Sequence, residues 1–360
     1  MEFGVQFFPA VGPAQKSAEV YFDESLRLCE LFDEYGYTNV RTVEHYFTPY
    51  GGYSPNPMIF LTAVAARTKK ARLTTGAVLP IFNNPLKIAG EIGMLDAISG
   101  GRLDVGMARA FLPHEFRRFG ISLDESVARF DEGVEQIRRL LEEEDVTMKG
   151  EFHSFENITS LPRPTQKPRP PFYTATTATP ESFVKAGQQG HSIMAIPLVG
   201  SRMKELLDMY RTAWRDAGHP GNGRVMLAFH MFCRESSKEA VRIARDPLNR
   251  YLKALVTAAS DWTTGTASKD YARYGEMIAK LSKETFESQV ESGAAWVGEP
   301  SELVDKIAWY DDMVGGFDIA SMQVNFENLS YDEAAPAIRL FGEKVIPHFA
   351  AKGADTESAA

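Results

Sequence analysis

The sequence predicts one α/β barrel of eight parallel strands, each followed by a helix. Three observations indicate this fold. Short β-rich runs alternate with longer stretches whose apolar residues recur at helical spacing, and counting them gives eight strand-then-helix units, the number that closes a TIM-type barrel. The 360 residues are enough for one such barrel with insertions. No linker splits the chain, so residues 1–350 should form a single domain, followed by a small, polar and flexible tail at 351–360.

The first half of the chain supplies four of the predicted units. Turn-forming residues separate the strands from the helices, and apolar residues recur every three or four positions within each helix. The predicted elements are strand 2–8 with helix 18–35, strand 39–42 with helix 58–68, strand 71–76 with helix 86–98, and strand 102–106 with helix 124–143.

The second half supplies the other four units after an interruption. A hairpin is expected over 146–155, and the proline-rich run 161–171 indicates a stiff surface connector. The long interval 261–295 breaks the alternation, which is typical of a lid or, equally, of an ordinary helical hairpin at the surface. The predicted elements are strand 172–175 with helix 180–189, strand 192–196 with helix 201–217, strand 224–233 with helix 238–258, an added helix 301–314, and strand 319–324 with helix 332–349.

Composition excludes several classes of function. The net charge is −9 and the Lys and Arg residues are scattered, so nucleic-acid binding is not expected. No apolar run is long enough to cross a bilayer and the chain opens without a signal-peptide pattern, so we expect a cytoplasmic protein without membrane contact. Cys29 and Cys233 should be buried thiols, with a single disulfide as the alternative. The seven histidines are dispersed and predict no metal site.

Residues that follow the strands should converge at one end of the barrel, where such folds hold their active sites. Glu44 and His45 come directly after strand 39–42, and His is the side chain that titrates near neutral pH. The predicted mouth has no glycosidase-like pair of carboxylates and no Ser-His-Asp order. Its apolar character suits a planar cofactor and an apolar or aromatic substrate. The candidate substrate-pocket residues, each of which could equally be a core residue, are Phe8, Phe111, Phe229 and Tyr251.

A phosphate site is predicted at the start of helix 180–189. Thr179 is a suitable N-cap and Pro180 suits the first helical position, and the free backbone N–H groups there attract an anion. Arg109 and Arg129 could add charge-assisted bonds to phosphate. The alternative interpretation is a good helix cap and a surface arginine.

Taken in order, these residues resemble the bacterial luciferase-like flavin monooxygenase family. The resemblance covers nearly the whole chain, and its specificity lies in the series rather than in any one motif. The matching segments are FGVQFF at 3–8, EHYFT at 44–48, TGAVLP at 75–80, NPLKIAGE at 84–91, LDAISGGRLDVG at 95–106, FYTA at 172–175 and VGEP at 297–300.

The resemblance implies a TIM barrel that binds reduced FMN, or deazaflavin F420, at the strand C-termini. His45 matches the catalytic histidine beside the flavin ring, and we expect Glu44 to orient it. Gly76 and Ala77 match the site of a non-prolyl cis peptide under that ring. The cofactor-binding residues that it implies are Gly76, Ala77, Met107, Ala108, Arg109, Arg129, Ala175, Thr176, Thr177 and Thr179.

The function implied is a two-component monooxygenase, which uses FMNH2 from a separate reductase and O2, through a C4a-peroxyflavin, to oxygenate a small apolar or aromatic substrate. The alternatives are a flavin- or F420-dependent hydride-transfer enzyme and a non-catalytic flavin-binding subunit. The family also implies a homodimer through helices 58–68 and 86–98, and a mobile lid at 261–295.

Three departures from the light-emitting catalytic subunit argue against light emission. Ala108 replaces a cysteine near the reactive flavin carbon, Thr176 replaces an acidic residue and Tyr46 replaces a second histidine. Retention of His45 argues against a non-catalytic subunit. The sequence determines neither the substrate nor the choice between FMN and F420.

Overall fold

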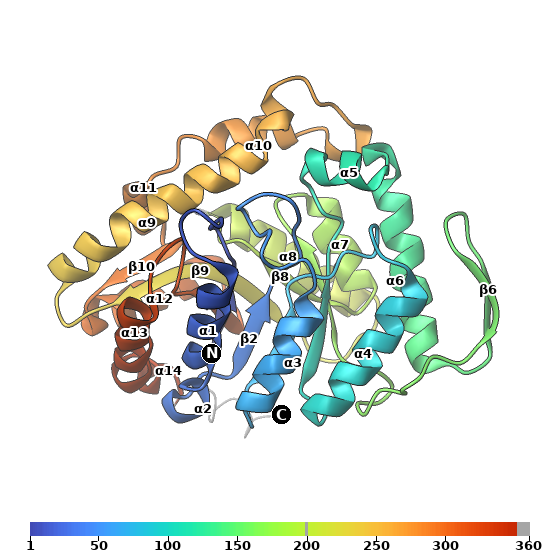
Figure 1. Cartoon of the computed structure of the whole chain (residues 1–360), viewed down its shortest axis with the longest axis horizontal. Helices are drawn as coiled ribbons and strands as arrows, with labels where there is room; N and C mark the ends of the chain where they lie inside the picture. The colour runs from blue at the N-terminus through green and yellow to red at the C-terminus, as the bar shows by residue number, and fades with distance from the viewer. Residues whose placement is uncertain (199–200, 351–360) are drawn as a thin grey trace.

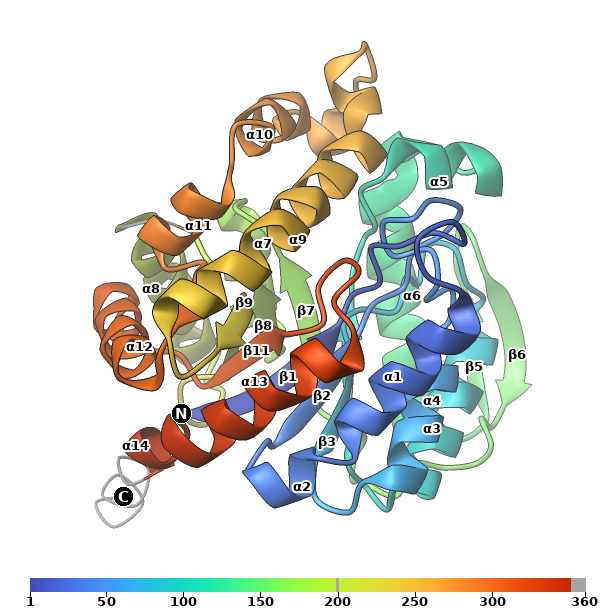
Figure 2. The ribbon, with the colours of Figure 1, turned by 60° about the vertical axis from the view of Figure 1, so that its left-hand side comes forward.

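Eight parallel strands close into a barrel in the computed structural model, which describes residues 1–198 and 201–350 (Figures 1 and 2). Each strand pairs with the next one in the chain, β8 pairs with β9, and the last strand pairs with the first. The predicted TIM barrel is therefore confirmed. The barrel strands are β1 (Glu2–Phe7), β2 (Asn39–Thr42), β3 (Arg72–Thr75), β4 (Leu103–Met107), β7 (Phe172–Thr176), β8 (Ser192–Ala195), β9 (Val225–Cys233) and β11 (Ile319–Gln323).

Helices surround the barrel, and several begin at caps that the sequence encodes. The Asn56 and Asn84 side chains accept hydrogen bonds from the N–H groups of the second helical residues of α3 and α4, and a proline occupies the first position of each. The main helices are α1 (Ala18–Cys29), α2 (Phe32–Tyr35), α3 (Pro57–Arg67), α4 (Pro85–Ser99), α5 (Pro113–Phe119), α6 (Ser126–Glu142), α7 (Pro180–Gln188), α8 (Ser201–Asp216), α9 (Ser237–Ala258), α12 (Pro300–Val314), α13 (Tyr331–Lys344) and α14 (Pro347–Ala350).

Several elements differ from the prediction. The helix predicted at 332–349 ends at Lys344 and is followed by the separate α14. The helix predicted at 18–35 ends at Cys29 and resumes as the short α2, which Gly36 terminates with a φ of 81°. The helix α5 and the strand β10 (Ala295–Gly298) were not predicted. β10 pairs in parallel with the second half of β9, outside the closed ring of eight. The predicted tail at 351–360 lies outside the described residues.

The interval 261–295 contains short helices rather than an irregular loop. They are η2 (Ser260–Thr263), η3 (Lys269–Tyr271), α10 (Tyr274–Leu281) and α11 (Phe286–Ser292). Figures 1 and 2 both show α10 and α5 at the same end of the barrel, the end toward which the strand arrows point. This interval therefore lies over the strand C-termini.

Two insertions, a hairpin and the proline-rich connector, lie between α6 and β7 in the chain. The predicted hairpin is confirmed as antiparallel β5 (Val146–Lys149) and β6 (Ser154–Ile158), preceded by the single-turn η1 (Leu123–Glu125) and α6. The connector is anchored where Gln166 donates to Asp96 and Arg163 donates to the last carbonyls of α6.

Cys29 and Cys233 are buried and free, as predicted. None of the described helices is both long and apolar enough to cross a membrane.

Candidate active site

The His45 imidazole is held by a carboxylate on α5, the helix that follows β4. Its Nδ1 lies 3.1 Å from Oε1 of Glu115, a completely buried residue in the first turn of α5. The same oxygen accepts the Tyr46 backbone N–H at 2.8 Å, which fixes the carboxylate in place. Nδ1–H donation to Glu115 selects one tautomer and leaves Nε2 available to a reacting group. We call His45 and Glu115 the dyad, and its geometry is suited to acid–base chemistry.

A glycine makes room for this ring. Gly51 has a φ of 80°, and a Cβ added there would lie 2.4 Å from Cβ of His45. The backbone turn that places His45 therefore requires glycine both for its conformation and for its size.

The expectation that Glu44 orients His45 is wrong. The buried Glu44 carboxylate accepts instead from the Tyr46 hydroxyl, from Asn83 Nδ2 at 2.8 Å and from the Leu79 N–H at 3.0 Å. Burial raises the pKa of Glu44 to about 7. Adjacent residues project in different directions as the strand ends, so Glu44 braces the loop after β3 while His45 faces the mouth.

Aromatic rings enclose the imidazole. The ring centroids of Phe8, Tyr50 and Phe111 lie 5.5, 5.6 and 5.9 Å from that of His45. Tyr251 from α9 completes the group, with its ring 5.7 Å from Phe8 and 5.8 Å from Tyr50. Three of the four predicted substrate-pocket residues therefore come together. The sequence reasoning missed Tyr50.

The fourth, Phe229, does not belong to this pocket. Its ring stacks on Trp296 at 4.0 Å and contacts Tyr310 and Phe317, so it lies in the core between β9 and the outer helices. The next residue, His230, faces the other way, with its ring 4.8 Å from Tyr251. Successive side chains on a strand point to opposite faces, so only one of these two residues can reach the pocket, and that residue is His230.

The predicted ring-binding residues lie at the ends of β3, β4 and β7. The Gly76–Ala77 peptide bond is cis, as the resemblance implied. Met107 is fully buried and bridges to Val78. Ala108 and Ala175 follow a paired stretch of β4 and β7 and are only partly buried, so small side chains border the mouth here.

The predicted phosphate region is partly assembled. Thr176 is buried and its hydroxyl has no partner. Thr177 and Thr179 lead into α7, and the Thr179 side chain makes no capping bond. The Arg109 side chain contacts the Asp270 carbonyl at 3.4 Å and the Tyr271 ring at 5.0 Å, and it forms no ion pair with the described residues. These groups remain available to an anion.

Arg129 is already engaged. Its guanidinium pairs with Glu125 at 2.8 Å and lies over the Phe152 ring at 4.1 Å, against the β5–β6 hairpin. Its charge is therefore already paired in this structure.

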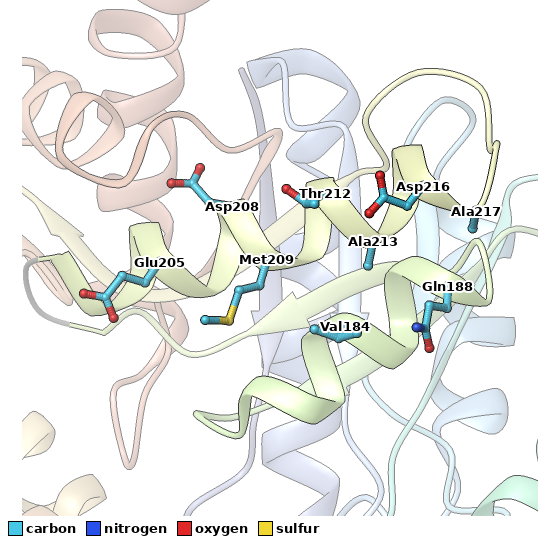
Figure 3. A pocket seen from close by; sticks show the side chains of 9 residues that line it. All are labelled: Val184, Gln188, Glu205, Asp208, Met209, Thr212, Ala213, Asp216 and Ala217. Carbon is cyan, nitrogen blue, oxygen red and sulfur yellow. The ribbon is translucent and has the colours of Figure 1, made fainter.

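One hollow on the described surface touches this site, and another lies away from it. The larger, about 700 Å³, lies between α7 and α8 on the outside of the barrel and is lined by groups such as Glu205, Met209 and Asp216 (Figure 3). The smaller, about 510 Å³, lies at the rim of the mouth and includes Tyr50 and His114 among its walls. The rim hollow is the one next to the dyad.

Comparison with known proteins agrees with this architecture. A family model described as luciferase-like monooxygenase matches residues 1–315. The oxygenase component of a flavin-dependent trigonelline monooxygenase from Acinetobacter baylyi is 28% identical over 358 residues, covering 96% of this chain and 94% of that protein.

Two solved structures are similar over almost their whole length. The monooxygenase RslO1 from Streptomyces bottropensis is 43% identical, with a TM-score of 0.86 over 97% of this chain and 100% of that one. The oxygenating constituent of 3,6-diketocamphane monooxygenase from Pseudomonas putida, solved with FMN, has a TM-score of 0.81 at 21% identity, over 96% and 98% of the two chains. At that identity the second likeness concerns the fold.

Proposed function

This chain belongs to the luciferase-like monooxygenase family, and on that premise we propose that it is the oxygenase of a two-component system. It takes reduced FMN from a separate flavin reductase and uses O2 to oxygenate a small organic substrate with an apolar or aromatic body. The observation that carries this proposal is the His45–Glu115 dyad, 3.1 Å apart inside an aromatic enclosure at the barrel mouth. A relative that is itself the oxygenase component of a flavin-dependent enzyme supports it.

The residues present fit a phosphorylated flavin. The unpartnered Thr176 hydroxyl and the first turn of α7 would hold the phosphate, with Arg109 beside them. The ring would lie along Gly76 and Ala77, where Ala108 and Ala175 leave room for a flat group. The bound flavin would supply the electrons that activate O2.

The chain's own residues transfer the proton and exclude water from the site. Glu115 holds Nδ1 of His45, so Nε2 gives or takes the proton at the reacting oxygen. A positioned acid–base group of this kind contributes about 10²- to 10⁴-fold to rate. Phe8, Tyr50 and Tyr251 are buried and keep water from the reacting centre.

The decisive assay couples the protein to a flavin reductase under ¹⁸O2 and analyses aldehydes, ketones and aromatic compounds by mass spectrometry. Incorporation of one ¹⁸O atom into a product, dependent on FMN and on this protein, is expected. Separate titrations with FMNH2 and with reduced F420 test the cofactor. Tight binding of F420 alone, with hydride transfer and no ¹⁸O in any product, would replace this proposal by the hydride-transfer function.

A homodimer through α3 and α4 forms part of the proposal. Ile59 on α3 and Met94 and Ile98 on α4 are large apolar side chains with 72%, 57% and 47% of their surface exposed. Adjacent exposed apolar residues of this kind are typical of an interface. We expect a dimer by light scattering, and a monomer with intact helicity for Ile59→Glu; a monomeric wild type would remove this part of the proposal.

We also propose that residues 261–295 act as the lid. Trp262 donates to the Phe111 carbonyl at 2.7 Å and Tyr271 donates to the Ala110 carbonyl at 2.9 Å. The segment is therefore hydrogen-bonded to the loop that carries the pocket residue Phe111. Hydrogen exchange of residues 261–281 should slow when FMN binds. Equal exchange with and without FMN would favour an ordinary surface hairpin.

A further inference from the structure

Four polar residues lie side by side on neighbouring strands inside the barrel. Arg41 on β2 is in register with Gln6 on β1, Gln6 with Gln323 on β11, and Gln323 with His230 on β9. Residues in register on adjacent strands project to the same side of the sheet. We name these four residues the polar layer.

Contacts place the polar layer at the mouth. The Arg41 guanidinium lies against Gly76, where an added Cβ would be 2.1 Å from the Arg41 Nε. The His230 ring contacts Tyr251, and the Gln323 amide donates to the Phe8 carbonyl at 2.8 Å. The layer therefore lines the floor of the aromatic enclosure.

Every member of the polar layer keeps a buried polar atom without a partner. These atoms are Oε1 of Gln6, Nε and Nη1 of Arg41, Nε2 of His230 and Oε1 of Gln323. The two glutamines are more than nine-tenths buried. Since buried polar groups are otherwise almost always paired, four such neighbours in one layer indicate a ligand.

The charge of the polar layer selects the kind of ligand. Burial lowers the pKa of His230 to about 3, so this ring is neutral. Burial lowers the pKa of Arg41 only to about 10, so the guanidinium stays positive at neutral pH. Its one hydrogen bond is a long contact of 3.4 Å to the Gly76 carbonyl. The layer thus presents a positive charge that has no carboxylate partner among the described residues.

The rim hollow independently points to an anion. Among its walls are four cationic side chains and two carboxylates, although the whole chain has a net charge of −9. Asp261 pairs with Arg117 and Glu327 with Arg250. The other two cations, Arg118 and Lys253, leave the hollow positive. A cationic approach of this kind raises the encounter rate of an anion.

We infer that the substrate carries an anionic oxygen group, most simply a carboxylate, which Arg41 binds while the apolar body lies among Phe8, Tyr50 and Tyr251. The planar guanidinium can form two parallel bonds to a carboxylate. This inference rests on the proposed function and specifies its substrate class.

The test uses the FMN-loaded protein and two probes of equal shape, 2-naphthoate and neutral 2-naphthamide, in isothermal titration calorimetry. Wild type should bind the carboxylate at least about tenfold more tightly, because a bond to a charged group is worth more than a neutral one. Arg41→Gln should remove that preference and leave the dissociation constants of FMN and 2-naphthamide unchanged. Arg139→Gln, which removes the same charge from an exposed pair with Glu143 on α6, is the matched control and should change nothing.

Several results would overturn the inference. One is a wild type that binds the naphthoate no better than the amide, or not at all. Another is an Arg41→Gln variant that keeps the preference for the carboxylate.

Weaker FMN binding by a folded Arg41→Gln variant would assign the arginine to the flavin instead of the substrate. If that variant does not fold, Arg41→Met serves in its place and must lose the preference for 2-naphthoate in the same way. A wild type that binds no FMN rejects the proposed function, whereas one that binds FMN without preferring the anion rejects only this inference.

Discussion

The two ends of the barrel differ in how they pair partly buried arginines. Near the base, Arg102 donates to the carbonyls of Ala65, Thr68 and Ala71 at 3.0, 3.1 and 2.7 Å, and its Nε donates to the Ser99 carbonyl. At the mouth, two Arg41 nitrogens have no partner. An arginine with every donor used stabilises the fold, whereas one left unpaired at a strand end is available to a ligand.

The largest effect should come from the mouth. His45→Gln should lower ¹⁸O-labelled product formation about 10²- to 10⁴-fold, because the acid–base group is lost. The melting temperature and the FMN dissociation constant should stay the same. Unchanged turnover would reject the role of His45.

The two arginines themselves give the second prediction. Arg102→Gln should lower the free energy of unfolding by about 4 kcal/mol, since it leaves several acceptors unpaired. Arg41→Gln should leave stability unchanged or raise it, because it removes a buried charge that nothing in the fold compensates. Chemical denaturation of both variants measures the change in the free energy of unfolding. If both variants were destabilised equally, the two arginines would not differ in their contribution to stability.

Glu44 gives a pH-dependent prediction. Its folded-state pKa is about 7, above the ordinary 4.5, so the folded protein holds a proton that the unfolded chain releases. Its contribution to stability is complete below pH 4.5 and is lost as the pH rises through 7. Between these limits the wild type should lose about 3 kcal/mol relative to Glu44→Gln. If the free energies of unfolding of the two proteins changed with pH in the same way, the raised pKa of Glu44 would be contradicted.

Substitution of Glu115 should have the smallest effect of the four changes predicted here. Glu115→Gln keeps an acceptor for Nδ1 of His45 but replaces a charge-assisted bond by a neutral one, so we expect kcat to fall about tenfold. KM should be unaffected, because Glu115 acts through His45. A change confined to KM would place Glu115 in substrate binding.

The periodicity of the sequence predicted all eight barrel strands because alternation of strand and helix is a strong, repeated signal. It did not predict β10 or α5, because both lie in insertions outside the repeated alternation of strand and helix. The partners of His45 were equally hidden. Glu115 is 70 positions away in the sequence, and only the closed barrel brings it to the imidazole.

The error at Phe229 has a different physical cause. The run Val225–Cys233 is buried on both faces and almost continuously apolar, so no alternation marks which side chains face the interior. Which side chains of such a strand face the barrel interior is known only once its pairing with the neighbouring strands is known. The same pairing revealed that Arg41, Gln6, Gln323 and His230 share one layer.

A crystal structure of the protein soaked with FMN tests the central claim most directly. We expect the phosphate at Thr176 and the first turn of α7, and the isoalloxazine ring over Gly76 and Ala77 within contact of the His45 imidazole. An empty mouth, or a ring bound away from His45, would contradict the account.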